Sequence, residues 1–85
     1  MVYSYVMREL TELAKNFTVA RKSRFPDDTL AEFSLRIGVS RATLQKMEKG
    51  DLSVSLHNYY RAAQILGLTA GFDDLFKREA SLFDE

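Results

Sequence analysis

The side chains of this chain that could do chemistry are hydrogen-bond donors clustered between Ser40 and Lys49. Arginine can donate two hydrogen bonds to O6 and N7 of guanine, glutamine suits adenine, and alanine can contact the methyl group of thymine. A helix over this stretch would turn Leu44 and Met47 toward a core and leave the polar residues on the opposite face. That open face consists of Arg41, Ala42, Gln45, Lys46 and Lys49. The pattern predicts a helix that can enter the major groove of duplex DNA.

Catalytic and metal-binding chemistry finds little support in the sequence. There is no cysteine, and the single histidine, His57, falls on a polar helix face without neighbouring ligands. We find no glycine-rich phosphate loop and no nucleophile paired with a base. No apolar run approaches the roughly 18 residues that span a membrane. We therefore expect a cytoplasmic protein that is not an enzyme, with no cofactor, no metal site and no membrane partner.

Two short helices around Gly38 would position the polar face. Leu30, Phe33 and Ile37 recur at three- and four-residue spacing, which indicates a helix over about Leu30 to Arg36. Gly38 can make the sharp turn that follows, because glycine adopts positive φ without strain. Ser40 is a suitable cap for the next helix. This arrangement predicts a helix-turn-helix at about residues 29–50.

The remaining chain reads as further helices of one domain that spans residues 1–85. An apolar stripe predicts a first helix over residues 3–23, which Pro26 would end. A fourth helix should follow Ser55 and end at Gly67, and a fifth is expected from Gly71 to the end of the chain. The fold class is therefore all-α. The early part of the stripe, with Tyr3, Val6 and Leu10, would be either additional core or a surface for another chain.

The charges of the chain are unevenly distributed, although its net charge is zero. Residues 1–50 hold nine Lys and Arg against six Asp and Glu, and residues 51–85 hold three against six. The basic half contains the expected helix-turn-helix, which suits DNA because binding needs a local positive face. In so small a chain, such asymmetry also arises by chance.

Several motifs resemble the Xre/Cro-type helix-turn-helix family. They are Ala31-Glu32-Phe33, Gly38-Val39-Ser40-Arg41-Ala42-Thr43-Leu44 and Met47-Glu48-Lys49-Gly50. The continuation, Gly50-Asp51-Leu52-Ser53-Val54-Ser55-Leu56 and Ile65-Leu66-Gly67-Leu68, is similar to a branch that includes antitoxins paired with HipA-type kinase toxins. The resemblance implies a compact five-helix fold like that of Cro and lambda repressor, here with an extended first helix. Leu30 departs from the family, which often has a phosphate-contacting glutamine there.

The resemblance also implies roles for individual side chains. Base contacts would come from Arg41, Ala42, Gln45 and Lys46. Contacts to the DNA backbone would come from Thr29, Ser40, Thr43, Lys49, Ser53, Ser55, Lys22 and Arg24. The last two would equally complement the negative end of the first helix dipole. Arg21 aligns with an arginine that pairs with the glutamate at Glu48 in relatives, so we expect a structural ion pair between them.

The implied function is a sequence-specific repressor that binds a palindromic operator as a homodimer. A dimerisation helix at about residues 71–84 would supply the interface residues Phe72, Leu75, Phe76, Leu82 and Phe83. Alternatively, Phe72 and Phe76 complete the monomer core. The sharper version of the hypothesis is an antitoxin whose partner is a HipA-type kinase toxin. The other hypotheses are a stand-alone phage-type or chromosomal regulator, and a helical protein-interaction module that does not bind DNA.

Overall fold

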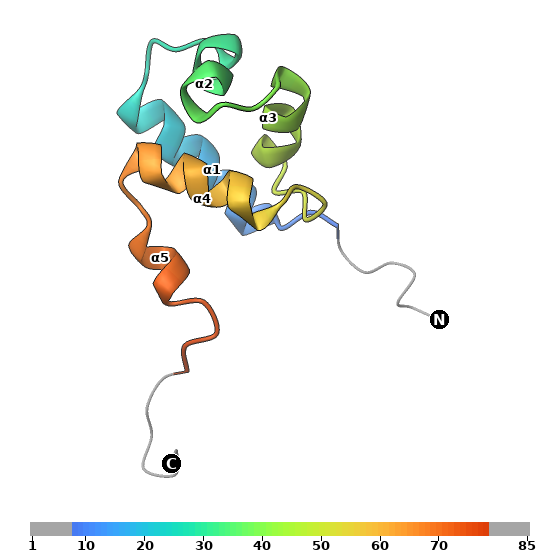
Figure 1. Ribbon diagram of the computed structural model, residues 1–85, viewed down its shortest axis with the longest axis vertical. Helices are drawn as coiled ribbons and strands as arrows, with labels where there is room; N and C mark the ends of the chain where they lie inside the picture. Colours follow the sequence, from blue (N-terminus) through green and yellow to red (C-terminus); the bar gives the residue numbers. More distant parts are fainter. Residues whose placement is uncertain (1–7, 79–85) are drawn as a thin grey trace.

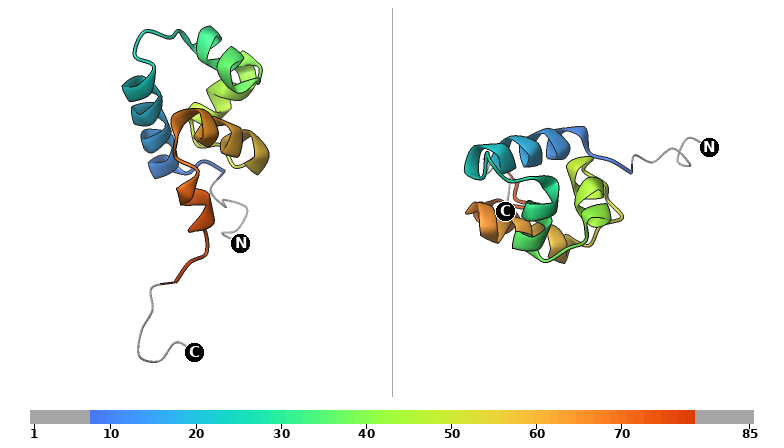
Figure 2. Two further views of the ribbon diagram at one scale, coloured as in Figure 1. Left: turned by 60° about the vertical axis from the view of Figure 1, so that its left-hand side comes forward. Right: turned by 90° about the horizontal axis from the view of Figure 1, so that it is seen from above.

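Five helices form the computed structural model of the protein, which describes residues 8–78. They are α1 (Thr11–Arg24), α2 (Leu30–Ile37), α3 (Arg41–Glu48), α4 (Leu56–Leu66) and α5 (Ala70–Asp73). Helices α1 to α4 contact one another around a shared core, and α5 extends away from α2 and α3 (Figure 1). Seen from above in Figure 2, α1, α3 and α4 lie around α2. The predicted all-α, five-helix fold class is confirmed.

The core is built from the apolar faces of the four packed helices. Phe33, Ile37, Leu44 and Met47 are fully buried, so α2 and α3 both turn their predicted apolar faces inward. The ring of Phe17 in α1 meets that of Phe33 edge to face, with their centroids 6.1 Å apart. Burial of each such side chain stabilises the fold by about 1.5–3 kcal/mol. The rotation of α3 about its axis is therefore determined by its apolar face.

Hydroxyl caps begin three of the helices. The side chains of Thr29, Ser40 and Ser55 accept hydrogen bonds from backbone amides in the first turns of α2, α3 and α4. Between α2 and α3 the chain reverses at Gly38, whose φ of 73° lies in the left-handed region that glycine favours. The predicted helix-turn-helix at residues 29–50 thus forms with its expected turn and caps.

The first helix is shorter than the predicted helix over residues 3–23. It begins at Thr11, and Leu10 before it is extended, with φ −98° and ψ 109°. Residues 8–10 instead lie beside residues 50–52: the Leu10 amide donates to the Gly50 carbonyl at 2.9 Å, and the Leu52 amide donates to the Arg8 carbonyl at 2.6 Å. The expected extension of the first helix is therefore wrong for residues 8–10, because pairing with a distant loop satisfies their backbone groups. Residues 3–7 lie outside the described range.

The C-terminal prediction is also wrong within the described residues. Helix α5 contains only Ala70–Asp73, and the chain then turns through Phe76, whose φ of 65° is incompatible with a right-handed helix. Phe72 is half-buried, with its ring 5.3 Å from that of Tyr60, whereas Leu75 is 49% exposed and Phe76 is 98% exposed. Phe72 therefore completes the core and Phe76 does not. Leu82 and Phe83 lie outside the described residues.

A buried tyrosine fixes the loop between α3 and α4. The Tyr59 hydroxyl donates to the backbone carbonyl of Asp51 at 2.7 Å, and burial raises the pKa of Tyr59 to about 12. The neutral phenol is thus a stable donor that anchors the loop to α4. None of the helices within residues 8–78 is long and apolar enough to cross a membrane.

Candidate nucleic-acid interface

The outer face of α3 carries the side chains expected to contact DNA bases. Ser40 caps this helix by accepting from the Thr43 amide at 3.0 Å, and its own hydroxyl donates to the Thr43 hydroxyl at 3.0 Å. Because Leu44 and Met47 have no exposed surface, the opposite side of the helix faces solvent. The solvent-facing residues include all four predicted base-contacting residues, Arg41, Ala42, Gln45 and Lys46.

A buried ion pair ties the end of α3 to α1. Arg21 donates two hydrogen bonds to Glu48, from Nε to Oε2 at 2.7 Å and from Nη2 to Oε1 at 3.2 Å. The Thr18 hydroxyl also donates to Oε1 of Glu48 at 3.0 Å. The side chains of Arg21 and Glu48 are only 9% and 18% exposed. A two-point contact of this kind restricts both distance and orientation, so it holds the outer face of α3 in one position relative to α1.

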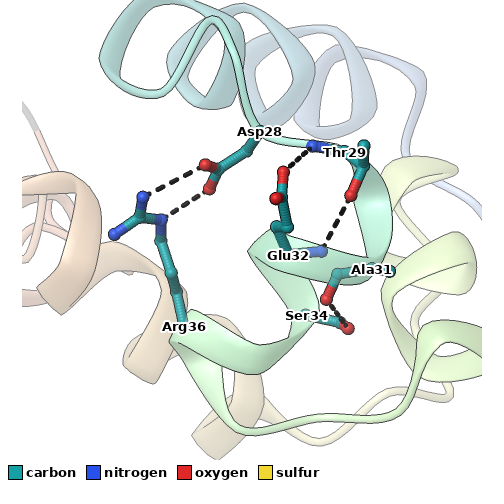
Figure 3. Close-up of polar contacts among 6 residues, drawn as sticks. All are labelled: Asp28, Thr29, Ala31, Glu32, Ser34 and Arg36. Carbon is teal, nitrogen blue, oxygen red and sulfur yellow. Dashed lines mark hydrogen bonds and ion pairs between the residues drawn. The ribbon is translucent and has the colours of Figure 1, made fainter.

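The N-terminus of α2 is closed by its own side chains. Thr29 Oγ1 accepts from the Glu32 amide at 3.1 Å, while Glu32 Oε1 accepts from the Thr29 amide at 2.8 Å (Figure 3). This reciprocal pair occupies two of the amides that could otherwise hold a phosphate at the helix start. The pair also places the Glu32 carboxylate at the start of α2. Because the Thr29 amide is already bound to that carboxylate, the donor that Thr29 can offer to a DNA phosphate is its hydroxyl group.

The connector before α2 is held by a second ion pair that the sequence patterns did not reveal. Arg36 donates from Nε to Oδ2 of Asp28 at 2.5 Å and from Nη2 to Oδ1 at 3.1 Å (Figure 3). The Arg36 guanidinium also lies 4.0 Å from the centroid of the Phe25 ring. Its hydrogen bonds hold the pKa of Asp28 below the usual value for that carboxyl group. The negative charge of Asp28 is therefore paired and directed at Arg36.

The other residues expected to contact the DNA backbone are exposed at element ends. Lys22 and Arg24 lie in the last turn of α1, and Lys49 is the residue at which α3 ends. In the loop before α4, the Ser53 amide donates to Oδ1 of Asp51 at 2.7 Å, and Ser55 caps α4 by accepting from the Asn58 amide at 3.2 Å. The Ser53 hydroxyl also hydrogen-bonds to the Asp51 carboxyl group and, with the Ser53 amide, holds the pKa of Asp51 below its usual value.

A model of the helix-turn-helix family matches residues 27–72, from the connector before α2 to the middle of α5. The match covers more than half of the chain. The protein belongs to the Xre-type helix-turn-helix family. This family is one of DNA-binding regulatory domains, and in this protein the helix-turn-helix consists of α2, the turn at Gly38 and α3. Comparisons with curated proteins and with solved structures give no match.

The helix-turn-helix protein depends on residues outside the matched range. Arg21, the partner of Glu48, comes from α1, and Leu10 pairs with Gly50 directly after α3. The matched segment thus contains α2 and α3, while Leu10 and Arg21, which precede it, hold the end of α3 and the residue after it in place. Among residues 8–78, no group of acidic, histidine or cysteine side chains is arranged to hold a metal ion.

The sequence patterns did not predict that the Arg61 side chain lies near the turn of this helix-turn-helix. A Cβ atom added at Gly38 would collide with the guanidinium of Arg61, so this side chain of α4 lies directly over the turn. The strict requirement at Gly38 is its positive φ, because the flexible, exposed Arg61 side chain can move away from a Cβ atom at this position. Helical spacing does not reveal such a contact, because it joins the turn after α2 to a residue of α4.

Proposed function

We propose that the protein is a sequence-specific transcriptional repressor that inserts α3 into the major groove of double-stranded DNA. The observation that supports this proposal is the difference between the two faces of α3, one buried and the other exposed and polar. Leu44 and Met47 are completely buried, Glu48 is bound to Arg21, and the opposite face is exposed. A recognition helix needs that combination of rigid attachment and an open polar face.

The chemistry of the open face suits base recognition. Arg41 can bind guanine through two hydrogen bonds, Gln45 suits adenine, and Ala42 can contact a thymine methyl group. Lys46 adds a further donor, and Lys49 at the helix end is suited to a phosphate. We assign base contacts to Arg41, Ala42, Gln45 and Lys46. We assign contacts to the DNA backbone to the charged side chains of Lys49, Lys22 and Arg24 and to the hydroxyl groups of Thr29, Ser40, Thr43, Ser53 and Ser55.

Substitution of Arg41 and Lys49 tests these two roles. The DNA probe is a duplex obtained by selection from a random-sequence pool, compared with unselected duplex of equal length. Arg41→Ala should lose about 1–3 kcal/mol on the selected duplex and relax the preference at one base pair. Lys49→Ala should weaken binding to both duplexes alike and reduce the slope of log affinity against log salt by about one.

Two results would contradict the assignment. If Arg41→Ala weakens binding to selected and unselected duplex equally, Arg41 does not read a base. If the unaltered protein shows no salt-dependent binding to any duplex, the helical interaction module without DNA binding is the better description. Lys15→Ala is a matched control for loss of one positive charge, since Lys15 is an exposed residue of α1 that is assigned neither to DNA nor to the dimer interface.

We further propose that the protein acts as a homodimer on a palindromic operator. One recognition helix reads only a few base pairs, which gives little discrimination among the sites of a genome. Two copies related by a two-fold axis would place two α3 helices about 34 Å apart, one turn of DNA. The apolar residues exposed beyond α4, Leu75 and Phe76, support an interface on that side of the molecule.

The antitoxin version of this function adds a kinase partner of the HipA type. It is supported by the resemblance of residues 50–56 and 65–68 to that branch of the family, and the stand-alone regulator is its alternative. Co-expression with the product of the adjacent gene separates the two. A kinase-like neighbour that purifies with this protein supports the antitoxin, and a neighbour of any other kind favours the stand-alone regulator.

A further inference from the structure

Phe76 is an aromatic side chain exposed almost completely, at a backbone position that rarely accepts one. It is the third residue of a turn closed by the Lys77 amide, which donates to the Asp74 carbonyl at 2.9 Å. Its φ of 65° is normally adopted there by glycine or asparagine. The ring is 98% exposed, the highest value among the exposed large apolar residues of the described chain. Neither the turn nor the monomer core accounts for a phenylalanine at this point.

An apolar groove of about 660 Å³ lies on the same side of the molecule. Residues before α1, in α1, α4 and α5, and in the loop after α3 line it, among them Leu10, Leu52, Leu56, Tyr59, Phe72 and Leu75. Three of these leucines, Leu52, Leu56 and Leu75, are about half exposed or more. The volume falls within the range of sites that bind apolar groups. Leu75 lines the groove, whereas the next residue, Phe76, does not.

We propose that two copies of the protein form a two-fold dimer in which Phe76 of each copy inserts into the apolar groove of the other. This inference rests on the homodimer proposed above and on no property of the DNA site. It assigns the interface to a projecting ring and a facing groove, in place of a pair of long C-terminal helices.

Reciprocal insertion explains why the backbone turns Phe76 outward. If the Phe76 ring packed in the groove of its own copy, it would lie beside Leu75. Residue 76 could then keep a right-handed backbone, and the positive φ would have no purpose. In a two-fold arrangement each ring–groove contact occurs twice, because the same patch faces itself across the axis. Two phenylalanine rings bury about 300–500 Å². The exposed leucines around each groove must supply most of the remainder of the roughly 1,200 Å² that a stable interface needs.

The charges near the groove and near the ring permit this approach. Leu10 and Leu52 on the groove follow Glu9 and Asp51, the two residues whose backbones pair in the bridge before α1. Lys77 directly follows Phe76, and its Nζ lies 3.8 Å from Oδ1 of Asp74, in an exposed pair that contributes little to stability. When the ring of one copy enters the groove of the other, Lys77 can exchange Asp74 for Glu9 of the second copy, whereas Asp51 is already close to Arg8 and Lys46.

The arrangement leaves the recognition helix free. Helix α5 lies at the opposite end of the molecule from α2 and α3 in Figure 1 and in the left view of Figure 2. Dimerisation through the region after α5 therefore does not cover the outer face of α3. Base contacts by α3 and dimerisation use separate surfaces in this proposal, and the two surfaces border one another where the groove residues Leu52 and Leu56 flank Ser53 and Ser55.

Replacement of the projecting ring tests the proposal by molecular mass in solution. Phe76→Ser should lower the dimer affinity at least tenfold in sedimentation velocity without changing the helical circular dichroism, since the ring supports no monomer contact. Leu35→Ser is the matched control, because Leu35 is an 80% exposed apolar residue on α2, away from the groove. The control should keep the mass of the unaltered protein. The proposal is overturned if Phe76→Ser remains a dimer of undiminished affinity.

A cross-linking experiment tests the reciprocal contact directly, because the chain contains no cysteine. Lys77→Cys and Leu56→Cys, both of which retain the Phe76 ring, are prepared as separate proteins, mixed, and treated with a short bismaleimide. A covalent heterodimer should form from the mixture, since any link between these two positions must then join two copies. A mixture of Leu35→Cys with Leu56→Cys should give none. Equal yields from the two mixtures would overturn the assignment.

The outcomes separate this inference from the proposed function. If the unaltered protein stays monomeric at tens of micromolar, both the homodimer and the ring–groove contact are wrong. If the dimer persists in Phe76→Ser, only the ring–groove contact is wrong. A dimer that dissociates in Phe76→Ser but shows no salt-dependent DNA binding supports the contact while the DNA-binding proposal fails.

Discussion

Glu48 and Arg21 show how one largely buried pair can position an exposed helix face. Neither contacts the solvent face of α3, but their two hydrogen bonds determine where that face lies relative to α1. For a buried pair, the free-energy cost of removing one partner differs from the net stabilisation that the pair provides. Removing one partner leaves the other charge without compensation, which costs far more than the net stabilisation that the intact pair provides.

Glu48→Ala should therefore lower the free energy of unfolding by about 3 kcal/mol, because it leaves the Arg21 guanidinium buried without its partner. Urea denaturation measures this as a shift in midpoint with little change in slope. The control is Lys15→Ala, which breaks the exposed Lys15–Glu12 pair and should cost less than about 0.5 kcal/mol. Similar small losses in both variants would show that the Arg21–Glu48 contact does not constrain the fold.

Tyr59 gives the stability of the protein a dependence on alkaline pH. The native pKa of about 12 lies above the ordinary tyrosine value of 10, so the native state keeps this proton after the unfolded chain has released it. The stabilisation is complete below pH 10 and declines as pH rises toward 12. Tyr59→Phe should lower stability by about 1 kcal/mol at pH 7 through loss of the hydrogen bond to Asp51. The difference between the two proteins, followed by urea denaturation, should shrink above pH 10; a constant difference would contradict this.

At the scale of elements, the segment before α1 supports the end of α3. Gly50 follows α3 with φ 69°, and a Cβ atom there would collide with the Leu10 carbonyl. The close approach of these two backbones joins residues 8–10 to the loop that leads into α4. Glycine at position 50 therefore allows the chain to adopt the positive φ that follows α3, and it also leaves room for the Leu10 backbone.

Three glycine-to-alanine substitutions separate these requirements. Gly50→Ala combines a left-handed backbone with a backbone clash and should destabilise by more than about 2 kcal/mol. Gly67→Ala has a similar φ of 73° but open space, so about 1–2 kcal/mol is expected from the backbone alone. Gly71→Ala lies in α5 with open space and should be neutral or stabilising. Thermal unfolding should rank the variants in this order, and equal losses at Gly50 and Gly67 would exclude a contribution from the Leu10 contact.

At the scale of the whole molecule, the two ends of the fold have different proposed tasks. The outer face of α3 is assigned to DNA, and the region after α5 to a second copy. If both assignments hold, affinity for DNA depends on the geometry with which two copies present their recognition helices.

A duplex with one half-site should accordingly bind about 100-fold or more weakly than the full palindrome, because the second helix no longer adds to the affinity. Lengthening the spacer between half-sites by half a turn of DNA should have a comparable effect, since the two helices then face opposite sides of the duplex. Fluorescence anisotropy with the selected duplex and its altered forms measures both. Undiminished binding to the single half-site would indicate a monomeric reader.

The sequence by itself determined the helix-turn-helix and its caps. Ser40, Gly38 and the spacing of Phe33, Ile37, Leu44 and Met47 act over a few residues, so local rules apply to them. Only the tertiary structure decided the rest. Leu10 is extended because Gly50, distant in the chain, offers a backbone partner. Asp28, in the connector, is paired because Arg36 lies eight residues later near the end of α2. The helix predicted from Gly71 stops at Asp73, before the turn that contains Phe76. Helical periodicity encodes neither the pairing of distant segments nor a contact between a helix and the connector before it.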